Sequence, residues 1–149
     1  MARLTGPTFG TPGDSTRRTT TAELPLGSIA YGPGTEWVYV KAGAAIAQYA
    51  ACIFQGSTLG FDDVRECGAV TNFIVGVADA AFASGDYGFI QTKGVAKAKV
   101  HASDTALLPV GGSTDAGVLL TVAETVPAGG KSIVPLVTGV AAGSNVYLG

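Results

Sequence analysis

The chain has 149 residues and a formal net charge of −2, with nine Lys and Arg against eleven Asp and Glu. This near-neutral balance creates no overall field that would draw the chain to nucleic acid or to an anionic membrane. Charged residues make up only 13% of the chain and hydrophobic residues 47%, against about 25% charged residues in typical soluble domains. We therefore expect a single core, and a surface that is covered in part by protein rather than by water.

The sequence predicts neither a membrane span nor a secretory signal. The longest apolar run, residues 42–54, is interrupted by Gln48 and is shorter than the roughly 20 residues of a spanning helix. No apolar segment follows Arg3, as a secretory signal requires. Synthesis in a reducing cytoplasm is expected, where Cys52 and Cys67, which lack C-x-x-C spacing, are free thiols.

Residues 1–23 predict an extended N-terminal arm. Gly and Pro recur between Gly6 and Pro12, and the segment has no hydrophobic period of either kind. Two interpretations stay open: a disordered terminus, or an arm that becomes ordered on a partner. In the second case the partner contacts are its large apolar and basic residues, which are Arg3, Leu4, Phe9, Arg17 and Arg18.

Residues 24–149 predict an all-β domain, because short runs rich in Val, Ile, Phe and Tyr alternate with Gly and Pro. The number and shortness of these runs indicate a single compact β-barrel or β-sandwich. The expected strands are residues 36–40, 49–54, 72–77, 87–91, 95–101, 117–122, 132–137 and 145–148.

The segment of residues 87–101 combines two expected strands. In its second half, Ala96, Ala98 and Val100 alternate with lysines and His101, which predicts one packed face and one outer face. Residues 92–94 separate the two runs and include a glycine, so a hairpin is expected there.

An internal similarity relates residues 35–55 to residues 71–91, which align without a gap. The aromatic residues Trp37 and Phe73 match, and so does the closing glutamine. Most identical positions are alanine, so two explanations stay open: a chance result of composition, or two copies of a strand, an alanine-packed turn and a strand.

No stretch predicts catalysis, a cofactor or a metal ion, and we expect no enzyme. The segment "TVPAGGKS", residues 125–132, lacks the first glycine of a phosphate-binding loop, and Pro127 removes an amide. His101 is the only histidine and has no G-x-S-x-G segment to accompany it. The acidic residues Asp62, Asp63 and Glu66 lack EF-hand spacing and are expected to form a solvated turn.

Two segments resemble the small capsid decoration, or cement, proteins of tailed bacteriophages. The first is "GVADAAFASGDYGFIQTKGVAKAKV", residues 76–100, and the second is "LGSIAYGPGTEWVYVKAGAAIA", residues 26–47. They carry glycine and alanine patterns rather than a reactive residue and cover roughly half of the chain. The longer arm and the residues after Ala123 depart from the smallest members, which leaves the attachment site on the capsid lattice open.

The resemblance implies a structural virion protein on the capsid exterior, synthesised in the cytoplasm of a bacterial host. Its partners would be the major capsid protein and further copies of itself in a homotrimer, with no nucleic acid, membrane or cofactor. Two alternatives stay open. A phage tail or head-fibre protein would share the glycine-rich β character, and a small β-barrel ligand-binding module or enzyme would need a pocket.

Overall fold

The computed structural model describes residues 14–55, 60–68, 74–100, 110–112, 116–121, 133–135 and 144–148. The predicted all-β class is confirmed. One 3₁₀ turn, η1 (Asp14–Thr16), precedes ten strands, and no α-helix occurs in the described ranges. The strands are β1 (Ile29–Gly32), β2 (Thr35–Lys41), β3 (Ala51–Phe54), β4 (Val64–Glu66), β5 (Gly76–Val77), β6 (Tyr87–Ala98), β7 (Val110–Gly112), β8 (Leu119–Thr121), β9 (Ile133–Pro135) and β10 (Ser144–Leu148).

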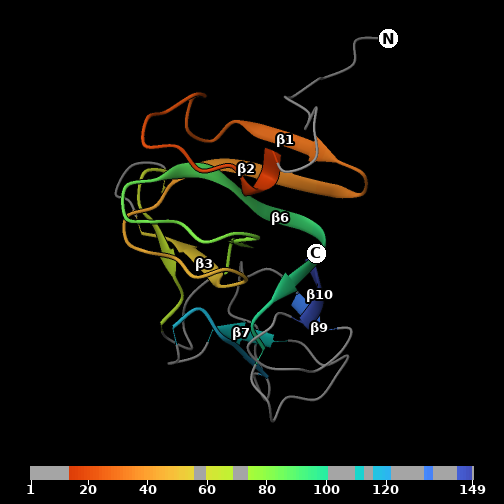
Figure 1. The fold of residues 1–149 in the computed structure, drawn as a ribbon. Helices are drawn as coiled ribbons and strands as arrows, with labels where there is room; N and C mark the ends of the chain where they lie inside the picture. Colours follow the sequence, from red (N-terminus) through yellow and green to blue (C-terminus); the bar gives the residue numbers. More distant parts are fainter. Residues whose placement is uncertain are drawn as a thin grey trace.

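The strands form an antiparallel network around β6, as Figure 1 shows. The main path is β4-β3-β5-β6-β10-β9-β7-β8, and β2 with its hairpin partner β1 branches from β6. The sheet is not closed into a barrel. An isolated parallel bridge between Ala42 and Val64 joins the residue after β2 to β4.

Strand β6 corrects the hairpin that the sequence predicted at residues 92–94. It runs without a turn, pairing with β2 over residues 87–93 and with β10 over residues 94–98. The register shifts so that Glu36 pairs with Lys93 but Trp37 with Gln91. Gly94 has φ +90°, and a Cβ there would overlap the carbonyl oxygen of Gly34. The irregularity of the β-bulge kind thus lies between Gln91 and Lys93, and Gly94 follows it where the strand changes partner without a chain reversal.

The predicted alternation along β6 is confirmed over the described residues. Ala96, Ala98 and Val100 are buried, whereas Lys97 is exposed. His101 lies outside the described residues. The outer half of β6 therefore has one face in the core and one face outside, as a strand of period two requires.

The buried side chains form three clusters on either side of β6 and β2. The largest lies between β3 and the half of β6 that pairs with β10. The second lies between the two similar segments. The third covers the opposite face of β2, and Leu24 and Leu26 pack on it. Cys67 belongs to the first cluster and Cys52 to the second. Both thiols are buried and free, as predicted.

Among the described residues, no helix has the length and apolar character needed to cross a membrane.

Candidate functional site

The two similar segments are a structural repeat in which strands of one copy pair with strands of the other. Strand β2 of the first copy pairs with β6 of the second, and β5 of the second pairs with β3 of the first. The registers correspond position by position: Lys41 with Tyr87 and Val40 with Gly88 in one ladder match Val77 with Ala51 and Gly76 with Cys52 in the other.

The loops that join these strands meet in the same symmetric way. The first loop is residues 42–50 and the second loop is residues 78–86. Ile46 and Phe82 donate to each other's carbonyl oxygens, at 3.0 and 2.9 Å. Around this pair, the bond from Ala42 N to Asp86 O (2.8 Å) has its equivalent in the bond from Ala78 N to Ala50 O (3.1 Å). The explanation of the repeat by chance composition is therefore wrong.

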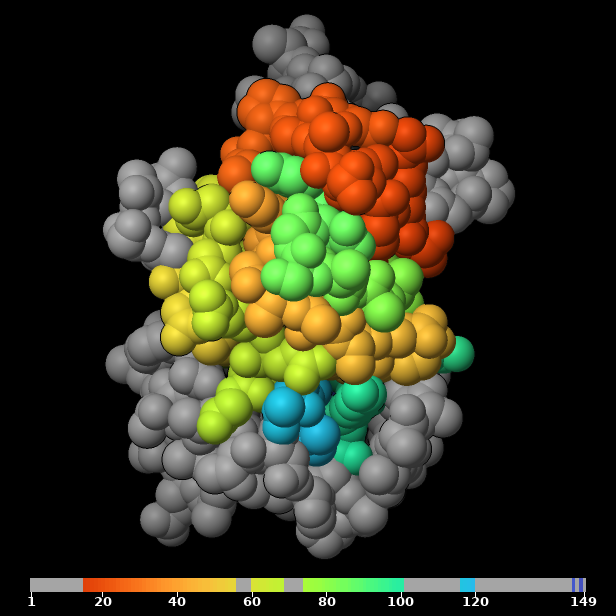
Figure 2. Space-filling view, turned by 60° about the vertical axis from the view of Figure 1, so that its left-hand side comes forward, coloured from red at the N-terminus to blue at the C-terminus, as the bar shows by residue number. Residues whose placement is uncertain are grey.

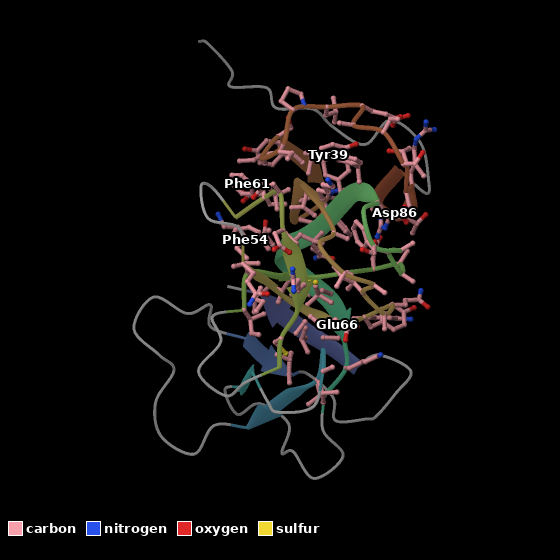
Figure 3. The ribbon with its side chains drawn as sticks, turned by 90° about the vertical axis from the view of Figure 1, so that its left-hand side faces the viewer. Tyr39, Phe54, Phe61, Glu66 and Asp86 are labelled. Carbon is pink, nitrogen blue, oxygen red and sulfur yellow. The ribbon has the colours of Figure 1, made fainter. Side chains whose placement is uncertain are left out.

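Each loop has one backbone N–H that is satisfied by a carboxylate, but the carboxylates come from different places. In the second loop, Ala83 N donates to Asp86 Oδ2 at 2.8 Å. In the first loop, the equivalent Ala47 N donates to Glu66 Oε1 at 2.6 Å. Figure 3 labels both acids: Glu66 projects from β4, and Asp86 lies at the end of its own loop, before β6. The acidic turn of the sequence analysis thus supplies a structural acceptor.

The N-terminal part of the described chain is joined to β6 by one isolated antiparallel bridge between Thr19 and Tyr87. We call residues 14–19 the strap. Thr19 N donates to Tyr87 O at 3.0 Å, and Tyr87 N donates to Thr19 O at 2.8 Å. In Figure 2 the red strap and the residues after it lie against the green residues of the second loop. Residues 14–19 of the predicted arm therefore pack on the β domain, beside the first residue of β6.

Arg18 fixes the strap to the second loop. Its guanidinium carbon lies 3.8 Å from the centre of the Phe82 ring, and Nη2 lies 3.1 Å from Asp79 Oδ1 and 3.0 Å from Ala80 O. A Cβ at Gly88 would lie 2.9 Å from Arg18 Cδ, so the glycine provides the space. The side chain is only 11% exposed.

The Arg18–Asp79 pair is electrostatically costly. Burial lowers the pKa of the Arg18 guanidinium, and this effect exceeds the attraction of Asp79. Burial likewise raises the pKa of Asp79, against the opposing contribution of Arg18. The Nε atom of Arg18 is buried, with no hydrogen-bond partner among the described residues. A pair of this kind contributes little net stability, because the cost of desolvation offsets its attraction.

The predicted contact residues thus divide into three groups. Arg18 binds Asp79 and packs on Phe82 of its own chain, and its role as a partner contact stays a prediction. Arg17 is exposed and forms an ion pair with Glu23. Arg3, Leu4 and Phe9 lie outside the described residues, and their role stays a prediction.

The sequence analysis missed strand β1 and its surface. Ile29 and Tyr31 are 38% and 43% exposed, although both are large apolar residues. The signal is a short apolar run, Ile29, Ala30 and Tyr31, before a Pro-Gly turn. With four residues, the strand is at the lower limit of what a sequence pattern can predict.

The described carboxylates do not converge on a common point. Asp63 binds Arg65, with 2.7 Å between Oδ1 and Nε, and Glu66 accepts from the first loop. Within the described ranges, no group of three or more His, Cys, Asp or Glu side chains could hold a metal ion.

No protein-family model matches the chain, and no significant match exists among curated proteins or solved structures.

Proposed function

We propose that the chain is a structural virion protein that binds the outer surface of a tailed-phage capsid and bridges neighbouring major capsid proteins. The observation that supports this proposal most directly is the strap. Residues 17–19 join the segment before Asp14 to β6 through paired backbone bonds and the Arg18 contacts. A partner that holds residues 1–13 therefore pulls directly on the sheet.

The proposed contacts in this segment are Arg3, Leu4 and Phe9. Ordering the segment on a partner costs on the order of 1 kcal/mol or more per residue. Apolar anchors, an arginine and backbone bonds to a sheet edge must together exceed that cost. Repeated contacts of a homotrimer, which we also propose, add through effective concentration on a lattice.

Labelling of purified particles from the source of the gene tests the location. We expect gold-labelled antibody against the chain to decorate the whole shell. Label confined to a tail or a fibre would support the alternative structural role and contradict decoration. Particles without label would contradict a virion protein of either kind.

A pair of full-length variants tests the arm. Leu4→Asp with Phe9→Asp should weaken attachment to shells that lack the protein, while the melting temperature stays nearly unchanged. Thr5→Asp with Thr8→Asp adds the same charge to the same segment but keeps the anchors, and should attach normally. Equal attachment of both variants would contradict the role of the anchors.

A further inference from the structure

Strand β1 is a sheet edge whose outer hydrogen-bonding groups have no partner among the described residues. It pairs with β2 alone, in the register Ile29 with Val38 and Tyr31 with Glu36. In Figure 1 it forms the outermost strand of the upper part of the molecule.

The geometry of the β1–β2 hairpin determines which groups point outward. Tyr39 N donates to Ser28 O at 2.8 Å, and hydrogen-bonded and non-bonded pairs alternate along an antiparallel ladder. Ala30, two residues on from Ser28, therefore also faces β2. Ile29 and Tyr31 direct their N–H and C=O groups away from β2.

This edge lacks the usual protection against strand addition. Natural edges carry charged residues, proline or a bulge, whereas the sequence of β1 is Ile-Ala-Tyr-Gly. The two residues with outward backbone groups are also the exposed apolar ones, Ile29 and Tyr31. An incoming strand would gain backbone bonds and apolar contact together.

We infer that this edge receives the N-terminal residues 1–13 of a second copy of the chain. The inference rests on the proposed function, in which residues 1–13 bind a neighbour, and it identifies that neighbour's surface. Leu4 and Phe9 are an odd number of residues apart, so an extended strand directs them to opposite faces. One would pack beside Ile29 and Tyr31, and the other on the face of Ala30.

The position of the strap favours a second copy over the same chain. The strap pairs with β6 at Tyr87, while β2 pairs with the other edge of β6 at the same residue. To reach its own β1, the segment would have to cross β6 and β2 over a face that Leu24 and Leu26 already cover. Thirteen extended residues span about 43 Å, enough to leave the domain and lie on a neighbour.

The contact also closes a ring. Arm and edge are different surfaces, so each copy donates one and receives one, which is a heterologous interface. In a closed ring every β1 edge is filled. A homotrimer is the closed assembly that the proposed function already names.

Amide hydrogen exchange of the full-length protein in solution, measured by NMR at low and high concentration, tests the inference. We expect amide exchange at Ile29 and Tyr31 to slow by about tenfold or more at high concentration. A tenfold change corresponds to about 1.4 kcal/mol. The amide of Ala30, already bonded to β2, is the internal control and should change little.

Variants separate the arm from other modes of association. Leu4→Asp with Phe9→Asp should abolish the slowing, and Thr5→Asp with Thr8→Asp should keep it. On the edge, Ile29→Lys should abolish it, whereas Val95→Lys, at a residue that is 52% exposed on another strand, should not. Slowing that is equal at both concentrations, in a protein that sediments as a monomer at both, would show binding within one chain, and no slowing would show a free edge. Either result overturns the inference.

Failure of the inference and failure of the proposed function can be told apart. Label over the shell with no protection at Ile29 and Tyr31 would reject the edge contact and leave decoration standing. Protection in solution without label on particles would do the reverse.

Discussion

The two copies of the repeat follow the same backbone path with different side chains. At one turn position the first copy has Tyr49 and the second has Gly85, and both adopt positive φ, at 65° and 88°. The tyrosine accepts a conformation that costs a non-glycine residue roughly 1–2 kcal/mol. The shared path is therefore enforced by the paired loops and strands and not by local preference at each residue.

The acceptors for the loop amides show why the copies differ. The position equivalent to Asp86 in the first copy is Ala50, which is fully buried. A Cβ at Gly117 would lie 2.6 Å from Ala50 Cβ, so no carboxylate fits there. Glu66 reaches the loop from β4 instead. One structural requirement is met by two residues that sequence alignment would never relate.

The largest expected effects are at the centre of the repeat, where Ile46 and Phe82 face each other. Phe82→Ala should lower the free energy of unfolding by about 3–5 kcal/mol, and Ile46→Ala by about 2–5 kcal/mol, as large-to-small core changes do. Phe82 should be the more sensitive because Arg18 also loses the ring beneath it. Urea denaturation measures both, with the exposed Val95→Ala as control. A Phe82→Ala effect no larger than that of the control would contradict this central role.

The strap distinguishes the copies further, because only the second loop receives an arginine from the N-terminal segment. Asp79→Ala should lower the free energy of unfolding by about 1–3 kcal/mol, since it leaves Arg18 largely buried without its anion. Arg18→Met combined with Asp79→Ala should recover much of this loss, because no unpaired charge remains. A double variant as unstable as the sum of the single changes Arg18→Met and Asp79→Ala would show that the two side chains have no coupling energy, which would contradict this expectation.

The two loop carboxylates offer a more local test. Glu66→Ala and Asp86→Ala should each cost about 1.5 kcal/mol, the lower limit for a hydrogen bond to a charged acceptor, because neither acid is fully buried. Amide exchange should rise at Ala47 in the first variant and at Ala83 in the second. Asp62→Ala, at an exposed position, should leave both amides unchanged. Faster exchange at both amides in either variant would mean that the loops open as one unit.

The smallest effect concerns pH. Because burial raises the pKa of Asp79 above its ordinary value of 3.8, the folded state binds the proton more tightly than the unfolded state. The resulting stability is present below pH 3.8 and is lost as the pH rises through the folded-state pKa. Relative to Asp79→Asn, the natural chain should therefore lose stability as pH rises through this range. Urea titrations at a series of pH values measure the difference, and a relative gain would contradict the direction.

The strand pattern was predictable where alternation was clear, as for Ala96 and Ala98 in β6. Strands β4 and β7 escaped prediction because "VRE" and "VGG" are too short and too rich in charge or glycine. The hairpin predicted at residues 92–94 is wrong, since a glycine with positive φ fits a continuous strand that changes partner as well as a turn.

The contacts of the candidate site depend on long-range pairing. Arg18 meets Asp79, and Ala47 meets Glu66, only after the two copies have exchanged strands. A single sequence states which residues are basic or acidic, but it does not state which of them meet across the repeat.

Strand β6 has a mechanical consequence. It is the one described strand that belongs to both parts of the sheet, joined to β2 over one half and to β10 over the other. Tension applied through the strap enters at Tyr87, the first residue of β6, and passes along a continuous backbone to the β10 ladder. The hydrogen bonds of the two ladders, which lie across the strand, are then loaded together in shear. A strand loaded in this way would transmit tension from the strap to the β10 ladder without separating β6 from β2.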